Sequence, residues 1–261
     1  MTDPTGPRLR ILVTGGAGYI GSHALARLQR AGHRLEVLDH LEQGHRNAIP
    51  PDVPLHLVDL RDAAAVARVV SAGHFDAVMH FAALISVAES VAFPERYLEN
   101  NLGGTRNLIR AVEASDTRRI VFSSTAAVYG DPDRIPIDES CPLAPANPYG
   151  ESKALAERAL RKWADADSRR SLSILRYFNV AGASGDGSLG EDHEPETHLI
   201  PNVLRAALDG SAPLTLYGQD YPTPDGTCVR DYIHVEDLVD AHAQVLERQQ
   251  GGEGHCFNLG I

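Results

Sequence analysis

Short apolar segments alternate with longer segments of helical pattern along residues 8–180 of the chain. Several of the short segments are apolar at almost every position, which is typical of parallel strands covered on both faces. The alternation therefore predicts an α/β fold built on a doubly wound parallel sheet. We expect strands at Arg10–Thr14, Arg34–Asp39, Leu55–Asp59, Ala77–Phe81, Ile120–Ser124 and Leu172–Tyr177, and helices at Tyr19–Arg30, Ala63–Ser71, Glu95–Ala114 and Gly150–Ala164.

A glycine-rich turn joins the first expected strand to the first expected helix. It reads Gly15-Gly16-Ala17-Gly18-Tyr19-Ile20-Gly21. Glycines in such a turn let the backbone approach a pyrophosphate, and the N–H groups that begin the helix can bind it. Glycines also mark ordinary turns, but the position between a strand and a helix favours a Rossmann-type dinucleotide site. We therefore expect NAD to bind here.

Acidic residues follow the second and third expected strands. A carboxylate about 20 residues beyond the glycine turn accepts hydrogen bonds from the adenosine ribose hydroxyls and repels a 2′-phosphate. Asp39 occupies that place, which favours NAD over NADP, although a turn or helix-cap role is the alternative. Asp59 ends the third strand and is expected to reach the adenine, although aspartate is common at strand ends.

The pattern changes after Asn179. A flexible loop over residues 181–187 and an acidic stretch over Glu191–Glu196 precede further expected elements. These are a helix at Asn202–Leu208, a strand at Leu214–Tyr217, a helix at Glu236–Arg248 and a strand within Cys256–Ile261. We expect an NAD-binding domain over residues 8–180, to which residues 231–261 return, and a small, incomplete substrate-binding lobe over residues 181–230.

Composition narrows the range of partners. The formal net charge of −11 argues against nucleic acid and anionic membrane as partners. The three cysteines form no CxxC pair, which fits a reducing compartment. No apolar leader or membrane-spanning run occurs in the sequence. We expect a soluble, cytoplasmic protein.

Tyr149 and Lys153 stand four residues apart at the start of an expected helix, so they share one face. A nearby ammonium stabilises a phenolate, so Tyr149 could remove a proton from a substrate hydroxyl. Most such pairs are solvated helix surface, but this one follows the fifth strand of a chain expected to bind NAD. Thr125, at the end of that strand, is the expected hydroxyl relay, whereas Ser123 and Ser124 suit a polar strand end better.

These segments together resemble the extended short-chain dehydrogenase/reductases and, within them, the UDP-glucose 4-epimerases. The matching segments are Thr14–Gly21, His80–Ala83, Glu89–Val91, Asn100–Asn101, Ser123–Gly130, Tyr149 with Lys153, Arg176–Ala181 and Val229–Val235. The resemblance implies that Tyr149 deprotonates the 4′-hydroxyl of a UDP-hexose, with Thr125 and Lys153 assisting, while hydride passes reversibly to NAD. It also implies a homodimer formed through helices near residues 95–114 and 150–164.

The resemblance extends the expected sites. The cofactor residues are Gly15, Gly18, Tyr19, Ile20, Gly21, Asp39, Asp59, Leu60, Phe81, Ala82, Asn100, Ser123, Tyr149, Lys153 and Tyr177. The substrate residues are Thr125, Phe178, Asn179, His198, Leu199, Tyr217 and Arg230. Arg230 could pair with a diphosphate, and its alternative role is a salt bridge to Asp231.

Other interpretations stay open at this point. The chain could be a non-catalytic NAD-binding module, although it keeps all three expected catalytic residues. It could be a nucleotide-sugar dehydratase or reductase, but 4,6-dehydratases carry an acidic residue where Ala126 stands. Because relatives continue beyond Asn258-Leu259-Gly260, we expect a truncated form with weakened activity.

A metal site is not expected from the sequence. The twelve histidines are scattered, and the one close group is His193 and His198 beside Glu191 and Asp192. None of the usual zinc-ligand spacings, such as HExxH, is found.

Overall fold

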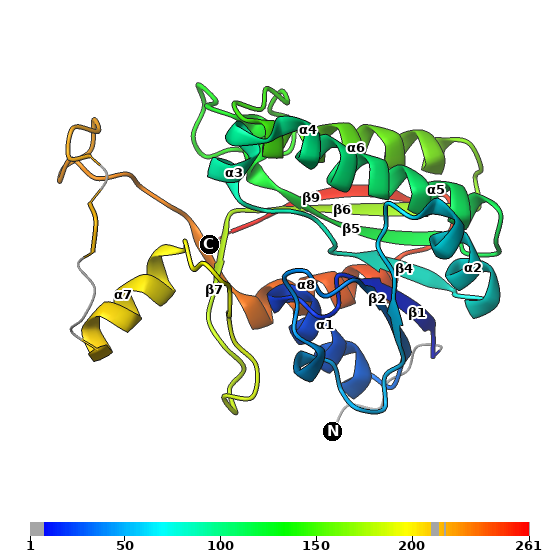
Figure 1. Ribbon diagram of the computed structural model, residues 1–261. Coiled ribbons are helices and arrows are strands. Elements are labelled where there is room, and N and C mark those ends of the chain that lie inside the picture. The colour runs from blue at the N-terminus through cyan, green and yellow to red at the C-terminus, as the bar shows by residue number, and fades with distance from the viewer. Residues whose placement is uncertain (1–7, 210–213, 217, 261) are drawn as a thin grey trace.

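A seven-stranded parallel sheet forms the centre of the molecule (Figure 1). The computed structural model describes residues 8–209, 214–216 and 218–260. The strand order is β3-β2-β1-β4-β5-β6-β9, and every pairing within it is parallel. The strands are β1 (Arg10–Thr14), β2 (Arg34–Asp39), β3 (Leu55–Leu57), β4 (Ala77–His80), β5 (Arg119–Thr125), β6 (Ser171–Tyr177) and β9 (Gly254–Leu259). The predicted α/β class and the parallel sheet are confirmed.

Helices cover both faces of the sheet, because strand residues pointing to either side are apolar. On one face α1 (Tyr19–Arg30) and α8 (Val235–Arg248) contribute Leu25, Leu28 and Leu246 to a core. On the other face lie α2 (Ala63–Gly73), α5 (Gly104–Glu113) and α6 (Pro148–Asp165) (Figure 1). Their side of the core includes Val70, Leu108 and Trp163. The sheet is therefore doubly wound, as expected.

The expected long helix at Glu95–Ala114 is divided in the structure. It consists of α4 (Pro94–Tyr97), a π-helical segment η2 (Leu98–Gly103) and α5. A further helix, α3 (Val87–Ala92), precedes α4, and two 3-10 turns lie elsewhere in the chain, η1 (Arg46–Ala48) after β2 and η3 (Ala126–Tyr129) after β5. π-helical turns are rare and frequently occur at functional sites. The segment η2 carries Asn100, one of the expected cofactor residues.

A two-stranded parallel ladder marks where the chain leaves the main sheet and where it returns. It pairs β7 (Asn179–Ala181) with β8 (Tyr232–His234). Between them, the described residues of the excursion extend away from the sheet and include α7 (Leu199–Asp209) (Figure 1). This path agrees with a separate lobe over residues 181–230, but the division into domains stays a prediction.

The strand expected at Leu214–Tyr217 is wrong. Residues 214–216 have no regular structure, and Tyr217 lies outside the described residues. The segment has the apolar alternation of a strand, but Leu214 and Leu216 are exposed and pair with no strand in the part of the chain that the structure describes. Among the described residues, no helix is long and apolar enough to cross a membrane.

Candidate active site

The expected functional residues gather at the carboxyl edge of the sheet. Thr14, Asp39, His80, Thr125 and Tyr177 are the last residues of five parallel strands. Thr14 pairs in register with His80, and Thr125 pairs with Tyr177. The direction of strand order reverses between β1 and β4. In open α/β sheets, ligands bind beyond the carboxyl ends of the strands at such a switch point.

The glycine turn contains one glycine that the fold itself does not require. Gly15 has a φ of +74°, and a Cβ there would lie 2.5 Å from the amide nitrogen of Ala82. A Cβ on Gly21 would lie 2.1 Å from the carbonyl oxygen of Gly15. At Gly18, by contrast, φ is −79° and the nearest atom to a Cβ would be 3.5 Å away. Gly18 thus keeps space open in front of α1, which suits close approach of a ligand to the backbone.

The N-terminus of α1 has the features of an anion-binding site. Gly18 is the N-cap residue and supplies no side-chain cap to the first N–H groups of the helix. These N–H groups and the helix dipole attract phosphate. A cavity of about 150 Å³ opens beside the turn, between Gly18, Tyr19 and the loop that holds Leu189 and Asp192. The residues of the turn therefore fit a dinucleotide phosphate.

Asp39 stabilises the turn, which was the alternative to ribose binding that the sequence left open. Its Oδ2 accepts a hydrogen bond from the N–H of Ala17 at 3.0 Å, and its Oδ1 accepts one from Leu41 at 2.9 Å. A carboxylate offers about four acceptor sites, so these two bonds leave capacity for ribose hydroxyls. Asp39 can therefore hold the glycine turn and a cofactor together.

The other expected adenosine contacts are less directly supported. The Asp59 carboxylate is bound by the Arg61 guanidinium, with a shortest distance of 2.6 Å. Hydrogen bonding to Arg61 lowers the pKa of Asp59, so the carboxylate stays charged. Leu60 is buried, and its carbonyl accepts a hydrogen bond from Asn107 at 2.9 Å. Contact of either residue with adenine stays a prediction.

Phe81, Ala82 and Asn100 continue the expected cofactor site. The N–H groups of Phe81 and Ala82 both donate to the carbonyl of Thr14, so the chain turns sharply as it leaves β4. The Nδ2 of Asn100 donates to the Oδ1 of Asn101, which is itself buried. These residues lie around the same strand ends as the glycine turn, although their contact with a cofactor stays a prediction.

Thr125, Tyr149 and Lys153 form the candidate catalytic group. Asn147 caps α6 by accepting from the N–H of Gly150 at 2.9 Å, which places Tyr149 in the first turn. Lys153 is one turn further along the helix and 3 % exposed. Its Nζ donates to the carbonyl of Ser123 at 2.9 Å and lies over the ring of Phe122. The pair expected from the sequence thus faces the end of β5.

The acidities in this group follow from burial and from its partners. Burial raises the pKa of the Tyr149 phenol to about 12, and a hydrogen bond with the Thr125 hydroxyl opposes that rise. The Thr125 oxygen already accepts from the N–H of Ala127 at 3.1 Å, so its O–H is available to donate. Burial lowers the pKa of the Lys153 ammonium to about 8, while the charge of Glu157 opposes that fall. A phenolate at Tyr149 requires positive charge near it, and Lys153 is the group one turn along the same helix that can supply it.

A buried ionic network behind Lys153 was not predicted from the sequence. Glu157 and Arg176 form a bidentate pair at 2.9 and 2.6 Å, and both side chains are almost fully buried. Ser124 donates to Glu157 at 2.6 Å, and Arg176 donates to the hydroxyl of Tyr129 at 2.7 Å. The spacing of Tyr149, Lys153 and Glu157 at four-residue intervals is the sequence signal that would have shown it. The network fixes α6 against β5 and β6.

Other expected residues have structural contacts of their own. The hydroxyls of Ser123 and Tyr177 are hydrogen-bonded at 2.5 Å. The Nδ2 of Asn179 donates to the carbonyl of Asp231 at 2.8 Å and so ties β7 to the returning chain. Arg230 is exposed, and its guanidinium donates to the neighbouring carbonyl of Val229.

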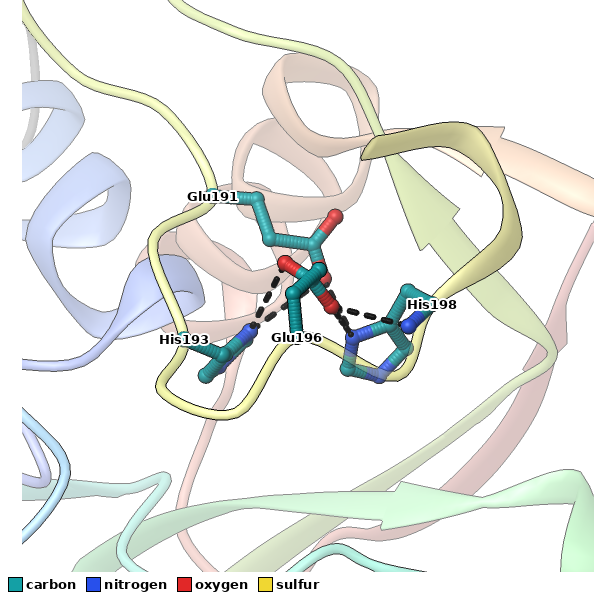
Figure 2. Close-up of side chains that lie close together, drawn as sticks. All are labelled: Glu191, His193, Glu196 and His198. Atoms are coloured by element: carbon teal, nitrogen blue, oxygen red, sulfur yellow. Dashed lines mark hydrogen bonds and ion pairs between the residues drawn. The ribbon is translucent and has the colours of Figure 1, made fainter. Parts of the chain in front are cut away.

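The remaining expected substrate residues lie toward the excursion. Phe178 is half-buried between β6 and β7. Leu199 begins α7 and is 58 % exposed. His198 lies in a cluster with Glu191, His193 and Glu196 (Figure 2). Tyr217 is outside the described residues. Their role in substrate binding stays a prediction.

Comparison with known proteins supports this description of the fold. Residues 11–260 match the model of the NAD dependent epimerase/dehydratase family. The UDP-glucose 4-epimerase of Lactobacillus helveticus is 48 % identical over 253 residues, which are 97 % of this chain and 76 % of that protein. The UDP-glucose 4-epimerase of Azospirillum brasilense is 48 % identical over 100 % of this chain and 75 % of its own length.

Solved structures agree in fold. The UDP-glucose 4-epimerase of Brucella ovis, in complex with NAD, has a TM-score of 0.91 and 44 % identity, covering 97 % of this chain and 77 % of that one. The enzyme of Bifidobacterium longum, in complex with NAD⁺ and UDP, has a TM-score of 0.91 and 38 % identity, covering 96 % and 78 %. The chain therefore belongs to the NAD dependent epimerase/dehydratase family.

Proposed function

We propose that this chain is a UDP-glucose 4-epimerase, which interconverts UDP-glucose and UDP-galactose with NAD held in the protein. The observation that carries the proposal is the placement of Tyr149, Lys153 and Thr125 at the same sheet edge as the open glycine turn. Relatives nearly half identical over almost the whole chain bear the same name. The activity is therefore that of an isomerase.

The chain's residues fit NAD at the turn, because Gly18 leaves the approach to α1 open and Asp39 has acceptor capacity left. When bound, NAD supplies a reversible acceptor for the hydrogen on C4 of the sugar. Tyr149 then holds or returns the proton of the 4′-hydroxyl, and Thr125 donates a hydrogen bond to the phenolate. The Lys153 ammonium favours the charged form of Tyr149.

Two alternative functions are less well supported. A 4,6-dehydratase would need an acid next to Thr125, but Ala126 and Ala127 follow it in η3. A non-catalytic NAD-binding module would not need a buried lysine on the helix face of Tyr149, because burial of an ammonium is costly. Epimerisation, by contrast, uses Thr125, Tyr149 and Lys153 and needs no acid after Thr125.

The test is conversion of UDP-galactose to UDP-glucose by the purified chain without added NAD, followed by chromatography of the nucleotide sugars. Tyr149→Phe removes the proton-transfer group and is expected to lower the rate by about 10²-fold or more. It should keep its bound NAD, measured after release by acid. Tyr221→Phe, at an exposed position, is the matched control and should convert at the parent rate. Equal rates for the parent and Tyr149→Phe would contradict the proposal.

Finer expectations accompany the proposed activity. The homodimer, the cytoplasmic location and a preference among sugars differing at C2 stay predictions. The helices α5 and α6, through which a dimer is expected, lie together in the outer layer on one face of the sheet (Figure 1).

A further inference from the structure

Four potential metal ligands converge in the loop that leads into α7. They are Glu191, His193, Glu196 and His198, and their side chains point toward one another (Figure 2). One ligand atom from each lies within 4.8 Å of all the others. The sequence places Asp192 beside Glu191 and the histidines, but the fourth member of the cluster in the structure is Glu196. Asp192 faces His45 instead, at 3.4 Å.

The nitrogen–oxygen distances within this cluster run from 2.8 to 3.9 Å and so span the separations between the ligands of a metal ion. Glu191 Oε1 lies 2.8 Å from Nδ1 of His198 and 3.4 Å from Nδ1 of His193. Glu196 Oε2 lies 3.9 Å from Nδ1 of His193. Ligands on a tetrahedral zinc ion, with bonds of about 2.0–2.2 Å, are separated by about 3.3–3.6 Å.

Two polar atoms in the cluster make no hydrogen bond, although they lie at ion-pair distance from each other and one of them lies at ion-pair distance from Glu191. They are Oε2 of Glu196 and Nδ1 of His193, and both are shielded from solvent. The Glu196 side chain is 1 % exposed. A buried polar atom without a partner is costly, and in native proteins it commonly signals a missing ion or water. Both unpartnered atoms belong to the convergent set, so they point to a ligand at its centre.

The charges in the cluster also favour a divalent cation. If both imidazoles were neutral, the two carboxylates would repel each other at close range. One protonated imidazole, such as His198 with its Nδ1 2.8 Å from Glu191 and from Glu196, balances only one of the two carboxylates. Two protonated rings with centroids 5.1 Å apart would repel each other. One divalent cation balances both carboxylates and accepts a lone pair from each neutral imidazole.

We propose that Glu191, His193, Glu196 and His198 bind a structural zinc ion that fixes the loop in front of α7. Two nitrogen and two oxygen ligands suit zinc, whereas calcium and magnesium prefer oxygen ligands alone. All four positions are filled by the protein, so the site is of the closed, structural kind. The sequence predicted no metal here because the spacing of the ligands matches none of the usual zinc motifs.

The test is zinc binding by the full chain after removal of metal with EDTA. Titration with zinc sulfate, followed by calorimetry, is expected to show about one tightly bound zinc per chain and a raised melting temperature. Cobalt is expected to give the intense visible absorption of a four-coordinate ion. Metal content after gel filtration gives the stoichiometry independently of catalytic activity.

Matched variants decide whether this cluster holds the zinc. Glu196→Gln and His193→Ala are each expected to weaken zinc binding by about tenfold or more and to abolish the thermal shift. Glu194→Gln changes an exposed acid in the same loop and should bind zinc as the parent does. Circular dichroism of the metal-free variants establishes that they are folded. The proposal is overturned if the parent binds no zinc, or if folded Glu196→Gln and His193→Ala bind it with parental affinity.

Discussion

At the scale of single residues, the glycines of the phosphate turn have different reasons to be glycine. Gly15 needs its positive φ and its close approach to Ala82. Gly18 needs neither, because its backbone is ordinary and a Cβ would meet no atom closer than 3.5 Å. The fold explains the first glycine, and we expect close approach of a bound ligand to explain the second. This difference can be measured.

Gly18→Ala is expected to leave the melting temperature of the NAD-free chain nearly unchanged and to weaken NAD binding by about tenfold or more, or about 1.4 kcal/mol. The added methyl group would occupy the space through which the pyrophosphate approaches the helix. Gly15→Ala should instead lower the melting temperature strongly, because the methyl group would collide with the backbone of Ala82. NAD affinity is measured by calorimetry and stability by scanning calorimetry.

A control for this comparison is Gly185→Ala, where a Cβ would have open space around it. That variant should keep both the parental stability and the parental affinity for NAD. If Gly18→Ala binds NAD as tightly as Gly185→Ala does, the turn does not hold the pyrophosphate.

At the scale of elements, α6 connects the candidate catalytic group to the core. One face of the helix carries Tyr149, Lys153 and Glu157 at successive turns, and Glu157 pairs with Arg176 of β6. Removing one member of a buried ion pair leaves the other charge without compensation. The position of Lys153 in α6 thus depends on a buried salt bridge that anchors the helix to β6.

Glu157→Gln is expected to lower the free energy of unfolding by about 3–5 kcal/mol, because Arg176 stays buried without its counter-charge. Urea unfolding followed by the fluorescence of Trp163, the single tryptophan, measures the change. Glu151→Gln, at an exposed position of the same helix, should change stability by less than about 0.5 kcal/mol. Similar effects from the two substitutions would show that the buried pair adds little.

The elements that the sequence predicted best are those with strong apolar periodicity and clear boundaries. The bounds of β1, β2 and α1 agree with the predicted ones, because a glycine turn and charged residues delimit them. The π-helical segment η2 was missed, since a change from i+4 to i+5 hydrogen bonding leaves no mark in the apolar pattern. The ladder of β7 with β8 was missed because its strands have three residues each.

The parts of the candidate site that lie within a single segment of the chain could be predicted from the sequence. The glycine turn and the pair of Tyr149 with Lys153 are local patterns, so the sequence alone shows them. The partners of Lys153 were less visible, because Ser123 comes from β5 and the pairing of Glu157 with Arg176 joins α6 to β6. The cluster around Glu196 is contained in one loop, but its convergence depends on backbone turns that spacing does not reveal.

At the scale of the whole molecule, α8 joins the returning end of the chain to the edge of the sheet that carries the site. His242 of α8 is fully buried and lies against the rings of Phe81 and Tyr177. Its Nδ1 is hydrogen-bonded to the carbonyl of Leu238 at 2.8 Å. Burial lowers the pKa of His242 to about 4, whereas burial raises that of Tyr177, so both rings are neutral near pH 7.

This histidine is expected to make the fold sensitive to mild acid. The folded pKa of about 4 lies below the unfolded value of about 6.5, so the unfolded state binds more protons between them. The contribution of His242 to the free energy of unfolding is fully present above about pH 6.5 and is lost as the pH falls toward 4. Going from pH 7 to pH 5 should cost the parent about 1–2 kcal/mol through His242. Urea unfolding at both pH values measures the loss.

His242→Leu fills a similar space without a titratable group, so its stability should fall less between pH 7 and pH 5 than that of the parent. A further acid-sensitive group, His80, is present in both proteins, because burial lowers its pKa to about 3. Its contribution therefore cancels in the comparison. His40→Gln, at an exposed position, should show the parental loss. If His242→Leu loses as much stability between pH 7 and pH 5 as the parent does, proton uptake by His242 is not a cause of the acid sensitivity.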